Sequence, residues 1–212
     1  MSEKLNLKNA ERKVFRATIS DGLWDILIAG FALQFAIAPL LSPILGDFWS
    51  SAVFVPFWGI LLFAIWLTRK YVVKPRTGVV KLGKQRIERL KKFGLVMLIV
   101  NVLALILGLI AAFYFHALSG QVITIIFGLI LLTGFSLAAY LVEYPRLYVS
   151  GLLFGIAPQV GEWLYSNHGV SHHGFPIIFG FISGVMFLAG LTTFVRFLHK
   201  NPIETNTAAQ GT

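Results

Sequence analysis

The stretch FGLVMLIVNVLALILGLIAAFYFHALSGQVITIIFGLILLTGFSLAAYLV, residues 93–142, contains no Asp, Glu, Lys or Arg. A helix needs about 20 apolar residues to cross the hydrocarbon core of a bilayer, so this stretch is long enough for two spans and a turn. Two more stretches, Ile26 to Thr68 and Leu147 to Val195, are interrupted only by Asp47 and Glu162. Each of them predicts another pair of spans. The chain is therefore predicted to be an all-α polytopic membrane helix bundle with six transmembrane helices.

The composition supports this class, because 57% of the 212 residues are hydrophobic and only 13% are charged. Soluble domains carry about 25% charged residues. The ends of the apolar runs place the helices at Leu23–Leu45, Trp49–Thr68, Phe93–Ala117, Gln121–Val142, Leu147–Tyr165 and Phe175–Leu198. The first twenty residues are polar and charged, so no cleavable signal peptide is expected.

Basic residues set the orientation, because Lys and Arg favour the cytosolic side of a membrane. All 18 of them fall in segments that can share one side, and ten lie between Arg69 and Lys92. We therefore expect a multi-pass protein of the cytoplasmic (inner) membrane with both termini in the cytosol. The basic segment 1–22, the six-helix domain 23–200 with its cytosolic loop 69–92, and a disordered polar tail 201–212 form the domain plan. Orientation explains the net charge of +9, and no nucleic-acid partner is expected.

The basic loop is also the candidate site for a partner, because ten cationic residues exceed what orienting a hairpin requires. Pro75, Gly78 and Gly83 predict an extended, turning first half, and Lys84 to Lys92 predicts a basic helix. Such a helix can lie on an anionic leaflet. The other interpretation is a solvated connector that only enforces orientation. The candidate lipid- or partner-binding residues are Arg69, Lys70, Lys74, Arg76, Lys81, Lys84, Arg86, Arg89, Lys91 and Lys92.

Polar groups inside spans are the first place to look for function, because they are costly in hydrocarbon. In the fifth predicted helix Pro158 removes a backbone donor beside Gln159 and Glu162, which predicts a kinked helix that could line a polar cavity. A rise of about 1.5 Å per residue places Glu162 near the outer face, which favours an outer vestibule or an interfacial carboxylate. At the start of the first predicted helix, on the expected cytosolic side, Asp21 and Asp25 either cap the helix or bind a cation or proton.

The outer loop EWLYSNHGVSHHG, residues 162–174, brings one carboxylate and three imidazoles close in sequence. Such groups can bind zinc, copper or nickel. Because glycines interrupt the segment, a loop is expected, and the alternative is a polar loop whose histidines titrate near neutral pH. The candidate ligands of a divalent transition metal are Glu162, His168, His172 and His173; no other cofactor is expected.

No catalytic constellation is apparent. The chain has no cysteine, no paired carboxylates of the kind that bind a metal and a diphosphate, and no Ser and His set like that of an intramembrane protease. We therefore expect a non-enzymatic accessory or scaffold module, with a second copy or another membrane protein as partner beside the lipid. The alternatives are a small transporter or channel lined by the fifth helix, with Asp25 at its mouth, and an outer-face metal site.

Two short tracts, DGLWD at 21–25 and YVVKPRTGVVK at 71–81, resemble patches of uncharacterised prokaryotic multi-pass membrane proteins. The resemblance covers about the first third of the chain. It implies a membrane location and a prokaryotic source and attaches no activity.

Overall fold

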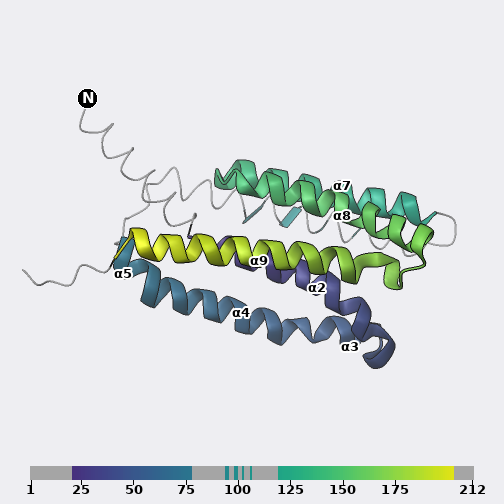
Figure 1. The fold of residues 1–212 in the computed structure, drawn as a ribbon, viewed down its shortest axis with the longest axis horizontal. Coiled ribbons are helices and arrows are strands. Elements are labelled where there is room, and N and C mark those ends of the chain that lie inside the picture. Colours follow the sequence, from purple (N-terminus) through teal and green to yellow (C-terminus); the bar gives the residue numbers. More distant parts are fainter. Residues whose placement is uncertain are drawn as a thin grey trace, which may run out of the picture. The chain divides into compact units, whose positions relative to one another are not determined.

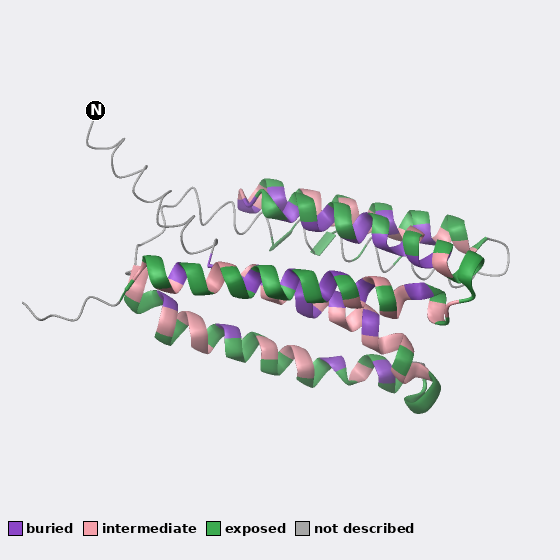
Figure 2. Ribbon diagram, viewed as in Figure 1, coloured by how far each residue is buried: buried purple, intermediate pink, exposed green. Residues whose placement is uncertain are grey.

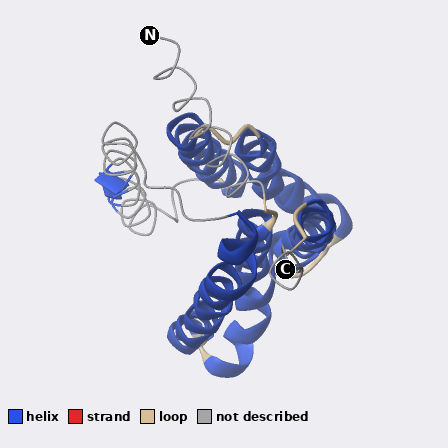
Figure 3. Ribbon diagram, turned by 90° about the vertical axis from the view of Figure 1, so that its left-hand side faces the viewer, coloured by secondary structure: helices blue, strands red, loops and turns tan. Residues whose placement is uncertain are grey.

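The computed structural model describes residues 21–77, positions 94, 95, 98, 99, 102 and 106, and residues 119–202. In this part of the chain the regular structure is helical throughout (Figures 1 and 3). The longer helices are α2 (Leu23–Leu45), α4 (Phe54–Thr68), α7 (Gly120–Val142), α8 (Arg146–His168) and α9 (Phe175–Lys200). The short elements are α3 (Asp47–Ala52), the π-helical turn η1 (Arg69–Val73), α5 (Lys74–Thr77) and the 3-10 turn η2 (His172–Gly174).

The all-helical class is confirmed for these residues, and the predicted first helix has the observed ends of α2. The ends of α7, α8 and α9 differ from prediction by three residues or fewer. The predicted helix Trp49–Thr68 is wrong as one element, because it is divided at Val53 into α3 and α4. Of the predicted helix Phe93–Ala117, only the six described positions can be compared, and they are helical.

Four segments of the described chain are long and apolar enough to cross a membrane: Leu23–Leu45, Phe48–Thr77, Gly120–Val142 and His172–Lys200. Helix α8 has 23 residues, which is sufficient length, but its sequence is less apolar than those of the other long helices. Exposed residues occur along all the long helices (Figure 2). Many of them are large and apolar, for example Val55, Ile60, Tyr140 and Phe181, each more than 70% exposed. This distribution is that of a membrane protein, because such surfaces are stable in lipid and not in water.

The described helices form two compact units, and α2 and α9 each contribute one part to each. In the first unit (residues 21–30, 52–77 and 184–202), the start of α2, the end of α4 with η1, and the end of α9 meet. Leu23, Ile65, Val73 and Phe197 form the buried core at this meeting point. The start of α2, the end of α4 with η1, and the end of α9 therefore lie together, and each has basic residues in it or beside it in the sequence.

The second unit includes residues 31–51 and the described residues from 94 to 183. Here α7 and α8 pack as an antiparallel hairpin, with Gly128 against the Gly155 carbonyl and Gly151 against Phe135. Small residues at such contacts allow helix backbones to approach closely in membranes. A cluster of phenylalanine rings fills the space beside the hairpin, and Phe154 and Phe179 at its centre have no exposed surface: Phe31, Phe35, Phe127, Phe135, Phe154, Phe175 and Phe179.

The first part of the basic loop differs from prediction, because residues 69–77 continue the helix instead of turning away. A proline inside an α-helix clashes with the carbonyl four residues before it. At η1 the Lys74 N–H bonds to the Arg69 carbonyl five residues back, which widens the turn immediately before Pro75. The π turn therefore allows the helix to reach Thr77. The second half of the loop, including the predicted helix Lys84–Lys92, lies outside the described residues, as does most of the segments 1–22 and 201–212.

Candidate functional site

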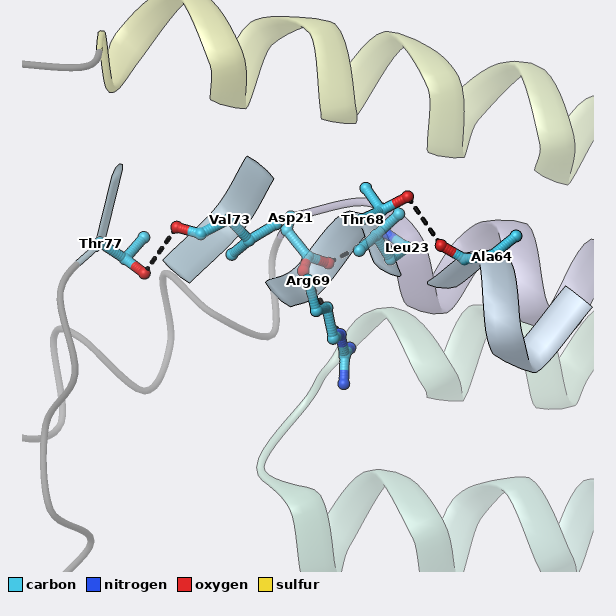
Figure 4. Close-up of polar contacts among 7 residues, drawn as sticks. All are labelled: Asp21, Leu23, Ala64, Thr68, Arg69, Val73 and Thr77. Carbon is cyan, nitrogen blue, oxygen red and sulfur yellow. Dashed lines mark hydrogen bonds and ion pairs between the residues drawn. The ribbon is translucent and has the colours of Figure 1, made fainter. Parts of the chain in front are cut away.

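Asp21 is the most deeply buried charged residue of the described chain, with 0% exposure. Its Oδ1 accepts a hydrogen bond of 2.9 Å from the Leu23 backbone N–H and so caps α2 (Figure 4). Its Oδ2 has no hydrogen-bond partner among the described residues and faces Arg69 Nε at 3.8 Å. This distance is long for an ion pair, so the positive charge of Arg69 compensates the negative charge on Oδ2 only in part.

Burial raises the pKa of Asp21 from 3.8 to about 6, because the surrounding protein disfavours the charged form. The hydrogen bond from Leu23 and the positive charge of Arg69 lower this pKa but do not cancel the effect of burial, to which Asp25 adds a small repulsion. Asp21 lies before the first apolar span and changes its charge in a range of pH that cells reach.

This shift predicts a pH-dependent stability. Between pH 3.8 and about 6 the folded chain binds a proton at Asp21 that the unfolded chain does not, so the free energy of unfolding falls as the pH rises through this window and is then constant. Asp21→Asn is expected to remove this component. Thermal unfolding followed by circular dichroism from pH 4 to 8, for both proteins in the same detergent, measures it. If the midpoint of thermal unfolding changes with pH in the same way in both proteins, Asp21 does not titrate in this way.

Arg69 is held against α2 by two contacts. Its side chain is 35% exposed, and its guanidinium carbon lies 5.7 Å from the centroid of the Trp24 ring, within the range of a cation–π interaction. Both Arg69 Nε and Trp24 Nε1 are buried donors without a hydrogen-bond partner in the described chain. Asp21, Trp24 and Arg69 thus form a buried polar cluster, named the α2–η1 cluster below, in which hydrogen bonds are incomplete.

The neighbouring basic residues divide into two groups. Arg76 binds within the protein, since its Nη1 donates to the carbonyls of Leu198 and Asn201 at 3.0 and 3.1 Å, at the end of α9 where helix carbonyls lack internal partners. Lys70 and Lys74 are exposed. The remaining candidates of the basic loop lie outside the described residues: Lys81, Lys84, Arg86, Arg89, Lys91 and Lys92.

Lys70 lies among aromatic rings. Its Nζ is 4.9 Å from the centroid of Trp66 and 5.1 Å from that of Tyr71, and both rings are more than half exposed. Tryptophan and tyrosine favour the headgroup level of a membrane, where a neighbouring lysine can reach phosphate.

The polar candidates of α8 face protein. Pro158 has almost no exposed surface, Gln159 Nε2 donates to the Thr124 carbonyl of α7 at 3.2 Å, and Glu162 is 7% exposed beside Gly120. Gln159 Oε1 has no partner among the described residues. The structure therefore places these three residues on one side of α8, against α7 and η2, and Asp25, which is also buried, in the other unit.

The histidine candidates are only partly brought together. His173 Nδ1 lies 2.7 Å from Glu162 Oε2, and its ring packs on Tyr165 with centroids 4.4 Å apart. His168 instead packs against Trp163 at the end of α8. Gly169, at a φ of 63°, ends α8 there, so His168 and His172 do not share a helix face. In the described chain no three His, Asp or Glu residues gather as metal ligands.

Sequence reasoning missed the α2–η1 cluster as a unit. Asp21 was expected as a helix cap or, with Asp25, as a cation- or proton-binding residue, and Arg69 was expected as a lipid- or partner-binding residue of the basic loop. One signal was present in the sequence: both segments were expected on the same side of the membrane. Comparison with protein-family models, with curated proteins and with solved structures gives no match for this chain.

Proposed function

We propose that this chain is a non-enzymatic accessory module of the prokaryotic cytoplasmic membrane that binds anionic lipid headgroups at the end of the first unit. The main support for lipid binding is that Lys70 lies between Trp66 and Tyr71, and that Lys74 is exposed one turn further along the helix. Arg76 ties this helix to the end of α9, where Arg196 and Lys200 are exposed. Exposed cationic side chains thus lie on two helices that meet at this end of the first unit, and one of them, Lys70, lies beside two aromatic rings.

The proposal includes six spans with both termini in the cytosol. It is supported by the meeting of the start of α2, the end of α5 and the end of α9, because the three segments that continue from these ends then leave from one end of the unit. Helix α8 is the fifth span in this proposal. Its outward side chains, such as Leu152, Ile156 and Val160, are apolar, whereas Gln159 and Glu162 face protein.

Replacing Lys70 and Lys74 by glutamine is expected to weaken the preference for anionic over zwitterionic lipid. Each basic residue near an anionic surface contributes about 1 kcal/mol, so the double substitution is expected to reduce the relative affinity by roughly tenfold or more. In a protein in which Trp66 is the only tryptophan, quenching of its fluorescence by brominated phosphatidylglycerol, compared with brominated phosphatidylcholine, reports this preference in vesicles.

The matched control is Lys70→Arg with Lys74→Arg, which keeps both charges and is expected to keep the preference. Equal quenching by the two brominated lipids while Lys70 and Lys74 are both present would contradict the proposed function.

A further inference from the structure

We propose that Asp21 is a proton-binding site between α2 and η1, and that binding a proton releases Arg69 to the phosphate groups of surrounding anionic lipid. The second half of this proposal rests on the proposed function. The first half stands on the geometry of the α2–η1 cluster alone.

The geometry favours proton binding because Asp21 has no exposed surface and, within the part of the chain that the structure describes, only one of its two oxygens is hydrogen-bonded. A buried carboxylate becomes neutral unless its charge is well compensated. Within the described residues the cation opposite it is Arg69, whose Nε is 3.8 Å away and makes no hydrogen bond. A proton on Oδ2 leaves the cap on the Leu23 N–H intact, since Oδ1 provides that cap.

The charged surroundings of Asp21 in the described chain are simple. From η1 it faces Arg69, and from α2 it is influenced by Asp25. Helix α9 contacts the adjoining Gly22 through Gly190, Thr193 and Phe194, none of which titrates. The exposed Arg196 and Lys200 lie further along α9, and Arg76 is engaged with its last carbonyls.

Arg69 is the group whose freedom changes. While Asp21 is ionised, the pair is close to neutral and Arg69 stays over Trp24. Once Asp21 is neutral, the guanidinium is an uncompensated cation with about a third of its surface exposed, next to Lys70. Guanidinium groups bind phosphate oxygens in pairs, so the lipid headgroup is the available counter-ion in a membrane. Lipid binding is then stronger in acid.

Trp24 provides an internal reporter, because its ring lies beside Arg69. The test uses a protein in which Trp24 is the only tryptophan, with Trp49, Trp58, Trp66 and Trp163 replaced by phenylalanine, in vesicles of zwitterionic lipid. Its emission is expected to change with pH around a midpoint near 6, and Asp21→Asn is expected to abolish the change. A transition that persists in Asp21→Asn, or none while Asp21 is present, overturns the proton site.

Arg69→Gln provides a second variant if Asp21→Asn fails to fold. Since the charge of Arg69 lowers the pKa of Asp21, its removal is expected to move the midpoint to higher pH. A midpoint that stays unchanged, or that moves to lower pH, contradicts the cluster as described.

The lipid step is tested by quenching the same Trp24 protein with brominated phosphatidylglycerol and brominated phosphatidylcholine. Preferential quenching by the anionic lipid is expected to increase several-fold from pH 8 to pH 5, and to be high at both in Asp21→Asn. An emission change without a pH-dependent increase in anionic preference keeps the proton site and overturns the release step, while the proposed function is tested separately by the quenching of Trp66. A preference that is independent of pH, with no emission change, overturns this inference and leaves the proposed function in place.

Discussion

Replacing Gly22 by alanine is expected to destabilise the first unit by about 2 to 5 kcal/mol, because two independent costs add. Gly22 has a φ of 83°, a left-handed conformation that costs an L-residue roughly 1 to 2 kcal/mol. In addition, a Cβ atom would collide with the Gly190 carbonyl oxygen and would lie 2.9 Å from the Phe194 nitrogen. Both neighbours are backbone atoms of α9, which cannot move aside without separating it from α2.

Gly46 is the matched control, since its φ of 80° is almost the same and no described atom lies within 4 Å of the position that an added methyl group would take there. Gly46→Ala therefore carries only the conformational cost, about 1 to 2 kcal/mol. Thermal unfolding of the two variants in one detergent measures the difference, which reports the contact between α2 and α9. Equal losses for the two variants would show that this contact does not contribute to stability.

The second large effect is expected for Gly128→Ala in the α7–α8 hairpin. An added methyl group would collide with the Gly155 carbonyl oxygen and with the side-chain amide of Gln159, so α7 and α8 would have to separate, and Gln159, which bonds to the Thr124 carbonyl, would also have to move. Overpacking of this kind costs about 1 to 3 kcal/mol. The measurement is again the midpoint of thermal unfolding.

Gly184→Ala, on α9, is its control because no described atom lies within 4 Å of an added methyl group. This variant is expected to be as stable as the unmodified protein or slightly more stable, since alanine favours a helix more than glycine does. If Gly128→Ala unfolds at the same temperature as Gly184→Ala, close approach of α7 and α8 through Gly128 is excluded.

The helix α2 could be predicted at both ends because local chemistry marks them. Asp21 caps its first turn, and Gly46 follows its last residue with a positive φ. The division at Val53 was missed, although Pro56 was a usable signal, since proline is tolerated in the first turn of a helix and not in its middle. The continuation through residues 69–77 was missed because Pro75 normally ends a helix, and a π turn has no reliable sequence signature.

The candidate site depended on tertiary packing to a greater degree. The partner of Asp21 is separated from it by the whole of α2 and α4, so periodicity and spacing contain no information about the pair. Similarly, Glu162 and His173 were expected near each other, but their direct contact depends on the left-handed backbone at His172 and His173, which histidine adopts infrequently. The sequence thus indicated which ends of the helices carry polar residues. The contacts between these residues, such as Asp21 with Arg69 and Glu162 with His173, depend on how the helices pack.

The π turn at η1 has a further consequence for the direction of the basic side chains. An extra residue in one helical turn rotates everything that follows by about 100° relative to an unbroken α-helix. With this rotation Arg69, before the wide turn, faces the start of α2, and Arg76, after it, faces the end of α9. Converting the π turn into a regular α-helix without a deletion would turn Arg76 away from its carbonyls, whereas deleting one residue within 70–73 would keep its direction. Because of this wide turn, one continuous helical segment can contact the start of α2 through Arg69 and the end of α9 through Arg76.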